Sequence, residues 1–146
     1  MQKNQRRVLI ENITPQLNNG DYKIKRVVNE IVTVNADILA DGHDIVAASV
    51  LYKHEKAKEW SEVRMQPGDN NWFASYTVEK QGLYAYKIIG WVDYALNWQH
   101  GIHRKIDDNQ IVNSELLEGI DFLKKCSKKA TASEKKYLDK LIISFA

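Results

Sequence analysis

The fold class of this chain is decided by one stretch, Glu30-Ile31-Val32-Thr33-Val34-Asn35-Ala36-Asp37-Ile38-Leu39-Ala40-Asp41-Gly42-His43-Asp44. Apolar side chains at Val32, Val34, Ala36 and Ile38 alternate with polar ones, which is the period-two pattern of a strand with one buried face. The dipeptide Asp41-Gly42 then marks a turn. The stretch therefore predicts a half-buried β-strand that ends in a tight turn.

Strand signals of the same kind recur on both sides of this stretch. Clusters of turn-forming residues separate them, as in Pro67-Gly68-Asp69-Asn70-Asn71. In the strand that contains Tyr84 and Tyr86, Gly90 stands where a bulky residue is expected. Short strands between turns predict an antiparallel β-sandwich of immunoglobulin-like type. The expected strands are about Val8–Glu11, Glu30–Leu39, Ile45–Lys53, Ser61–Met65, Asn71–Val78 and Leu83–Val92.

After about Asp107 the apolar period changes to that of helices. Thr131 and Glu134 have the spacing of a capping box, with direct capping by Ser133 as the alternative. We therefore expect a mostly-β chain that ends in an α-helical hairpin, with residues 1–106 as the sandwich domain and residues 107–146 as the helical part. The two apolar stripes are Leu116, Leu117, Ile120 and Leu123, and Leu138, Leu141, Ile142 and Phe145.

Length and composition exclude several classes of protein. A chain of 146 residues suits one domain, or one small domain with an appendage. A formal net charge of +2 is too small to indicate a nucleic-acid partner. No apolar run is long enough to predict a membrane span. The single cysteine, Cys126, excludes an internal disulfide framework and favours a cytoplasmic location.

The turn Asp41-Gly42-His43-Asp44 places two carboxylates and an imidazole close together, as acid/base or metal chemistry would need. A structural turn is the favoured interpretation, because Gly42 suits a turn and Asp and His side chains often bond backbone amides there. No cofactor or metal is expected. His100 and His103 lack further ligands at zinc spacing.

The tryptophans are the other candidates for a site. Trp72 lies on an alternating apolar face and is assigned to the core. Trp91 and Trp98 lie near a strand end and in the polar segment that follows, where stacking on a sugar ring is conceivable. Packing is favoured for both, since aromatic side chains are used heavily in cores.

Six short motifs occur in an order that resembles one known family. They are RVLIEN-x-x-P from Arg7, KR-x-x-x-E from Lys25, AD-x-x-x-DGHD, Trp72-Phe-Ala, Gly82-x-Tyr84-x-Tyr86 and Trp91-Val-Asp93. Together they resemble the N-terminal domain of the maltose-1-phosphate-dependent α-1,4-glucan maltosyltransferases of the α-amylase superfamily. Tyr22-Lys23-Ile24 departs from the family, which carries an aromatic–proline pair before the Lys-Arg.

The resemblance implies a non-catalytic, cytoplasmic N-terminal domain that helps to form a homodimer, followed by the start of an inserted helical bundle. Lys25, Arg26, Asp41, Gly42, His43 and Asp44 would then be turn or interface residues, and the catalytic carboxylates would lie in a barrel domain outside this chain. The parent enzyme would transfer maltosyl units from maltose 1-phosphate to an α-1,4-glucan. The alternatives are an autonomous module that binds α-glucan and a stand-alone protein-interaction sandwich. Glucan binding by this chain is expected to be weak at most.

Overall fold

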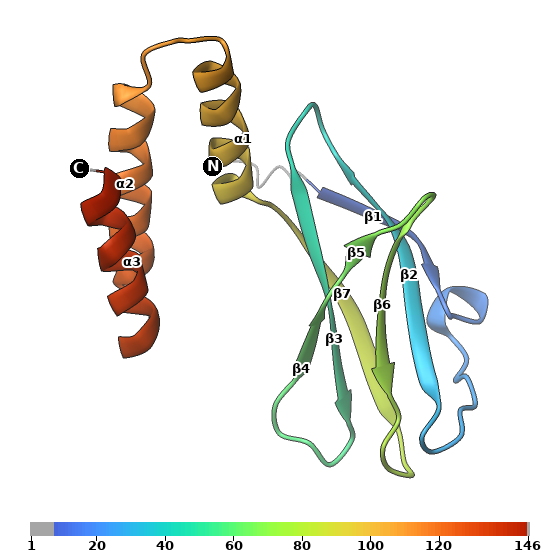
Figure 1. The fold of residues 1–146 in the computed structure, drawn as a ribbon. Coiled ribbons are helices and arrows are strands. Elements are labelled where there is room, and N and C mark those ends of the chain that lie inside the picture. Colours follow the sequence, from blue (N-terminus) through green and yellow to red (C-terminus); the bar gives the residue numbers. More distant parts are fainter. Residues whose placement is uncertain (1–7, 146) are drawn as a thin grey trace, which may run out of the picture. The chain divides into compact units, whose positions relative to one another are not determined.

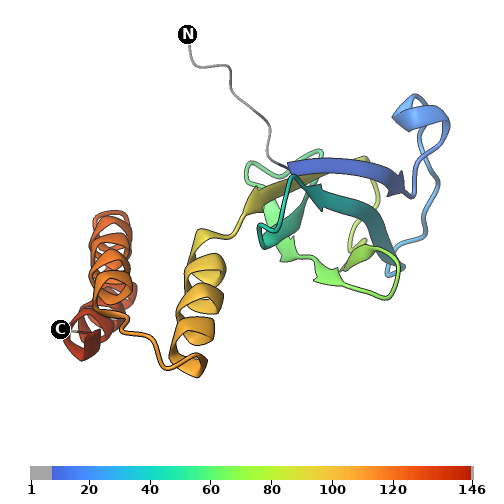
Figure 2. The same ribbon diagram turned by 90° about the horizontal axis from the view of Figure 1, so that it is seen from above.

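The computed structural model describes residues 8–145, so that Arg7, the first residue of the first motif, lies outside the described residues. The chain forms two compact units, one that ends at Asp93 and one that begins at Tyr94 (Figures 1 and 2). The first is built from strands and the second from helices. The predicted fold class, mostly β with helices at the C-terminal end, is confirmed.

The first unit consists of two antiparallel sheets (Figure 1). One sheet has the strand order β1-β2-β6-β5 and the other β4-β3-β7. All six predicted strands are present, although β1 continues beyond the expected end at Glu11. The bounds are β1 Val8–Thr14, β2 Ile31–Ala40, β3 Val46–His54, β4 Ser61–Arg64, β5 Gln66–Pro67, β6 Trp72–Thr77 and β7 Tyr84–Val92, with a short 3-10 turn η1 at Asn18–Gly20.

The chain passes from one sheet to the other between β4 and β5. Val63 in β4 pairs with Val50 in β3, whereas Pro67 in β5 pairs with Trp72 in β6. Met65, between the two strands, is 2% exposed, and its N–H donates to the carbonyl of Ala48 at 2.9 Å. This buried side chain anchors the crossing, so that the expected strand Ser61–Met65 ends at Arg64 and a further strand, β5, follows in the other sheet.

The core lies between the two sheets. The alternation in β2 is confirmed, because Val32, Val34, Ala36 and Ile38 are all at most 6% exposed. Burial of one such valine or isoleucine side chain contributes about 1.5–3 kcal/mol. Gly90 is explained by a close approach between β7 and β1. A Cβ atom at Gly90 would lie 2.9 Å from a methyl carbon of Val8, so that any larger residue would push the strands apart.

The helical unit begins earlier than the sequence indicated. Helix α1 covers Tyr94–Asp107, so residues 94–106 are helical and lie outside the sandwich, in contrast to the boundary at residue 106 that the sequence predicts. The only buried residue among the described positions of α1 is Ile102. With one buried residue, the helix has no apolar stripe for periodicity to reveal. The C-terminal part therefore has three helices instead of a hairpin of two.

Helices α2 (Asn113–Ser127) and α3 (Ala132–Phe145) match the two predicted apolar stripes. The glutamate half of the predicted capping box is present, since Glu134 Oε2 accepts the N–H of Thr131 at 2.8 Å. The same oxygen also accepts the hydroxyl of Thr131 at 2.7 Å. Leu117 does not belong to the buried stripe of α2, because its side chain is 65% exposed. Gly119 and Ile120 are buried instead. Among the described residues, every helix is too short or too polar to cross a membrane.

Candidate functional site

The two polar motifs that flank β2 do not form one site. The Lys25-Arg26 segment precedes β2 and the Asp41–Asp44 turn follows it, at opposite ends of the sandwich (Figure 1). The ten residues of β2 separate them by about 33 Å at the usual rise of a strand. Each motif therefore has its own local role.

The Asp41–Asp44 turn is held by its backbone. Gly42 has a φ of +79°, a conformation that glycine adopts without strain. In residues 8–145, neither Asp41 nor His43 makes a side-chain hydrogen bond or ion pair, so the expected bonds to backbone amides are absent there. Asp44 does have a partner. Directly after the turn, the N–H of Asp93 donates to the carbonyl of Ile45 at 2.8 Å, which extends the pairing of β3 with β7 to the end of the turn.

No group of three potential metal ligands comes together among the described residues. His100 and His103 lie in α1, where both are exposed.

The Lys25-Arg26 segment forms a compact turn around Glu30. Arg26 Nε lies 3.5 Å from Glu30 Oε1, and its Nη1 donates to the carbonyl of Lys25 at 2.9 Å. Glu30 Oε2 in turn accepts the N–H of Val27 at 2.8 Å. These bonds hold the Arg26 guanidinium beside a cavity that the sequence did not reveal.

This cavity, called here the β7 slot, lies between the segment 15–28 and the strand β7 and has a volume of about 680 Å³. Tyr86 connects its two sides, because its hydroxyl donates to the carbonyl of Pro15 at 2.7 Å. The ring of Tyr76 stacks on that of Tyr52 with a centroid distance of 4.2 Å. The slot is therefore bordered by aromatic side chains in fixed positions.

Burial keeps the tyrosines of the slot neutral. It raises the pKa of Tyr76 to about 12 and also raises the pKa of Tyr86. The positive charge of Arg26 opposes both shifts, which is consistent with a guanidinium near the two phenols. Arg26 and the Gly82-x-Tyr84-x-Tyr86 motif occur separately in the sequence, and no local pattern indicates that they border one cavity.

Trp91 lies on the outer face of the sheet β4-β3-β7, because it alternates with the inward residues of β7. The guanidinium carbon of Arg64 is 4.6 Å from the centre of its ring. Arg64 also forms an ion pair with Asp93 at 3.3 Å. The Arg64 guanidinium thus lies over the Trp91 ring and is held by Asp93.

Trp60 belongs to the same outer face, although the sequence did not single it out. The ammonium groups of Lys53 and Lys87 lie 5.2 and 4.6 Å from the centre of its ring. Both lysines alternate with inward residues of their strands, and Trp60 is 38% exposed. The outer face therefore carries two tryptophans, each beside cationic side chains.

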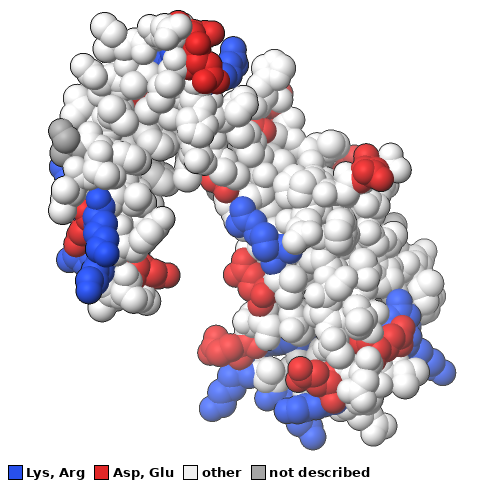
Figure 3. Space-filling view, in the orientation of Figure 1, with Lys and Arg blue, Asp and Glu red and all other residues white. Residues whose placement is uncertain are grey.

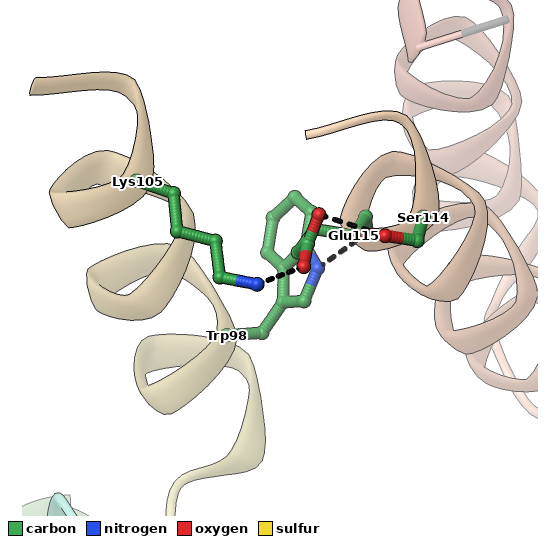
Figure 4. A network of polar contacts seen from close by, with 4 residues as sticks. All are labelled: Trp98, Lys105, Ser114 and Glu115. Atoms are coloured by element: carbon green, nitrogen blue, oxygen red, sulfur yellow. Dashed lines mark hydrogen bonds and ion pairs between the residues drawn. The ribbon is translucent and has the colours of Figure 1, made fainter. Parts of the chain in front are cut away.

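Trp98 lies in the helical unit, on α1 (Figure 4). Its Nε1–H donates to the carbonyl of Glu115 at 2.7 Å, and its ring covers Gly119 and lies 5.7 Å from that of Phe145. The contacts connect α1 with α2 and α3, so the indole packs inside this unit.

A polar network next to Trp98 connects α1 with α2 (Figure 4). Lys105 in α1 forms an ion pair and hydrogen bond with Glu115 in α2, and the hydroxyl of Ser114 donates to Glu115 at 3.0 Å. The bond from Lys105 holds the pKa of the Glu115 carboxyl below its usual value. The network therefore stabilises the helical unit when Glu115 is ionised.

Comparison with known proteins covers nearly the whole chain. Residues 6–145 match the family model described as alpha-1,4-glucan:maltose-1-phosphate maltosyltransferase, domain N/S. Among the proteins of that name that are similar to it are three from different organisms. The one from Methylacidiphilum infernorum is 36% identical over 82% of this chain and 18% of its own length. The one from Chlorobaculum tepidum is 37% identical over 78% of this chain and 17% of its own length. The one from Picrophilus torridus is 36% identical over 94% of this chain and 22% of its own length.

The chain thus spans about a fifth of the length of these relatives. The family model and the relatives agree with the resemblance carried by the six motifs. With its two-sheet fold and following helices, the chain belongs to the alpha-1,4-glucan:maltose-1-phosphate maltosyltransferase family, in which it matches domain N/S.

Proposed function

We propose that this chain is a non-catalytic scaffolding and dimerisation part of a glucan-building maltosyltransferase. The parent enzyme would be cytoplasmic and would transfer maltosyl units from maltose 1-phosphate to an α-1,4-glucan. The helical unit would be the start of an inserted bundle. We also assign the sandwich to the immunoglobulin type, since β1-β2-β6-β5 has the order of an ABED sheet and β3 and β7 take the places of C and F.

The observation that carries the scaffolding role is the exposed apolar surface of the helical unit. Ile111, Leu117, Tyr137 and Ile143 are 64% or more exposed. Much of the helical surface in Figure 3 is also uncharged. Apolar patches of more than a few hundred Å² are uncommon on monomeric proteins and mark interaction sites. These side chains are suited to contacts with the rest of the parent enzyme or with a second subunit.

Association through this surface should depend on concentration. Removing apolar surface from water contributes about 25 cal/mol per Å², so a few hundred Å² contribute several kcal/mol. The entropic cost of association is of similar size. A reversible dimer is therefore expected for the 146-residue chain.

Sedimentation velocity across a wide concentration range tests this role. The double variant Leu117→Glu with Ile143→Lys should lower the dimer fraction, because it places charges on the exposed apolar surface. The matched control, Glu118→Lys with Lys140→Glu, changes neighbouring exposed residues and should leave the fraction unchanged. A strict monomer at high concentration, or equal effects of both double variants, would contradict the proposal.

The non-catalytic assignment follows from the resemblance, which places the catalytic carboxylates in a barrel domain. Incubation of the 146-residue chain with maltose 1-phosphate and a maltooligosaccharide should release no phosphate. Release by a contaminant-free preparation would show that this chain carries catalytic groups of its own.

A second candidate function is an autonomous module that binds α-glucan. The observation that favours it is the outer sheet face with Trp60 and Trp91, since exposed aromatic rings can stack on sugar rings. Titration of tryptophan fluorescence with maltoheptaose should give weak binding, at about millimolar or worse. Micromolar binding that is lost in Trp60→Ala and Trp91→Ala, but kept in Trp98→Leu, would favour this module over the scaffold.

A further inference from the structure

His54 ends the strand β3, and both nitrogen atoms of its imidazole ring are engaged. Nδ1 lies 3.2 Å from the backbone nitrogen of Lys56, and Nε2 lies 3.0 Å from the carbonyl oxygen of Gln81. A backbone N–H can only donate a hydrogen bond, and a carbonyl oxygen can only accept one. Nδ1 is therefore the acceptor, and Nε2 carries the proton. Only the neutral Nε2–H tautomer of His54 makes both bonds.

The two bonds join the loops that lie at the lower end of the sandwich in Figure 1. Lys56 belongs to the connection between β3 and β4, residues 55–60, called here the 55–60 loop. Gln81 belongs to the connection between β6 and β7, residues 78–83, called here the 78–83 loop. The imidazole also meets the ring of Tyr84 edge-on, with a centroid distance of 5.0 Å. The ring is thus packed against β7 as well as bonded to both loops.

The bond from Lys56 is the one that depends wholly on the imidazole. On either side of it, the N–H of Glu55 donates to the carbonyl of Leu83 at 2.8 Å, and the N–H of Ala57 donates to the carbonyl of His54 at 2.9 Å. Among residues 8–145, no backbone carbonyl accepts the N–H of Lys56. The 55–60 loop is therefore held at its middle by a ring nitrogen that can take up a proton.

Protonation would change the two ring bonds in opposite ways. Histidine is the side chain that ordinarily gains its second ring proton between about pH 5 and 8. The imidazolium carries a proton on each nitrogen, so Nδ1 would become a donor that faces the donor N–H of Lys56. The bond from Nε2 to the carbonyl of Gln81 would remain, and a charged donor makes it stronger. A proton therefore releases one loop and keeps the other.

Charges of both signs lie around the ring, which is only partly buried. Glu55 Oε1 lies beside the ring, because both of them border the position of a Cβ atom at Gly82. From β7, the facing titratable group is the phenol of Tyr84. The two loops carry three carboxylates and three ammonium groups, Glu55, Glu59 and Glu79, and Lys56, Lys58 and Lys80. The contact that a proton on Nδ1 abolishes is the bond from Lys56.

We propose that His54 is a proton-sensitive clamp between the two loops. In neutral solution it holds the 55–60 loop at Lys56, and in mildly acidic solution it lets this loop go while it stays bonded to Gln81. The sheets are unaffected, because β3 and β7 are paired along their whole length by backbone bonds. The released segment leads into Trp60, so the order of the chain beside the outer sheet face changes with pH.

Nuclear magnetic resonance of the isotope-labelled 146-residue chain tests the clamp. In neutral solution, correlations within the His54 ring should identify the Nε2–H tautomer. As the pH falls from about 8 to 5, the amide proton of Lys56 should shift upfield along the titration curve of the ring. Order parameters of residues 56–59 should fall from above about 0.8 to below about 0.6, and those of residues 79–82 should stay high. An Nδ1–H tautomer, or a Lys56 signal that does not follow the ring, would overturn the proposal.

Two substitutions fix the clamp in its two states. His54→Asn places a carbonyl oxygen near the position of Nδ1, so Lys56 keeps an acceptor at every pH. His54→Gln places an amide group near the position of Nε2 and leaves Lys56 without an acceptor. Order parameters of residues 56–59 should stay high in the first variant and low in the second, in neutral and in acidic solution alike.

The matched control is His100→Gln, which removes an exposed histidine from α1 and should respond to pH as the unmodified chain does. A pH response of His54→Asn equal to that of the unmodified chain would overturn the assignment to this ring. If a His54 variant failed to fold, as seen by circular dichroism, the tautomer and the Lys56 signal of the unmodified chain would still decide. Sedimentation of the helical variants reads the scaffolding role separately, so either idea can fail without the other.

Discussion

Replacement of Gly119 by alanine should destabilise the helical unit, although alanine is the better helix former. A Cβ atom at this position would lie 2.4 Å from Trp98 Cζ2 and 2.9 Å from Cε2. Carbon atoms in favourable contact are about 3.5–4.0 Å apart, so the indole would have to move by about 1 Å. Its bond to the carbonyl of Glu115 and its contact with Phe145 oppose that movement.

The magnitude follows from two opposing effects. Overpacking of a well-packed site costs about 1–3 kcal/mol. Alanine in place of glycine inside a helix contributes about 1 kcal/mol in the other direction. The variant Gly119→Ala should therefore lower the free energy of unfolding by about 1 kcal/mol. In α1, Gly101 has no atom within 4 Å of its Cβ position, so Gly101→Ala should raise that free energy by about 1 kcal/mol.

Thermal and urea unfolding followed by circular dichroism at the helical band measures both changes. Trp98→Leu removes the indole, and in that background Gly119→Ala should become stabilising. The double-mutant cycle would then give a coupling of about 1–3 kcal/mol between the two positions. If Gly119→Ala stabilised the chain with Trp98 present, or if no coupling were found, the packing argument would be refuted.

Three further predictions concern the turn, the cap and the tyrosines. Gly42→Val should lower the free energy of unfolding by about 1–2 kcal/mol, because valine is strained at a φ of +79°. His43→Ala should change that free energy by less than about 0.5 kcal/mol. Equal melting midpoints of the two variants would contradict this expectation. Glu134→Ala should lower the melting midpoint of the helical unit through loss of its bonds to Thr131, and an unchanged helical melt would show that these bonds are not needed. The raised pKa of Tyr76 contributes stability that is present below pH 10 and is lost as the pH rises toward about 12. Melting curves between pH 8 and 12 should fall less steeply for Tyr76→Phe than for the unmodified chain, and identical slopes would refute the assignment.

Local sequence patterns were sufficient to predict an element of the fold where one type of residue decides the local structure. The alternation from Val32 to Ile38 predicted β2 because each inward side chain meets the opposite sheet. The spacing of Thr131 and Glu134 predicted the start of α3, since the cap depends on four consecutive residues. Gly42 was placed correctly in a turn because its backbone conformation is a local property.

The candidate sites were only partly predictable. The motifs that contain Arg26 and Tyr86 could be read from the sequence, but their meeting at one cavity could not. Trp91 and Trp98 were grouped because they are close in sequence, whereas the chain turns from strand to helix between them. Trp60 was not singled out, because its neighbours Lys53 and Lys87 come from two other segments.

By itself, the sequence determined the positions of six of the seven strands that the structure describes, two of the three helices and the family. These depend on short-range periodicity and on motifs whose order survives in the linear chain. Tertiary structure alone decided the two-sheet division at Met65, the close approach that requires Gly90 and the open edge of β7. Each of these depends on which distant segments lie side by side, and contacts between distant segments leave no periodic signal in one sequence.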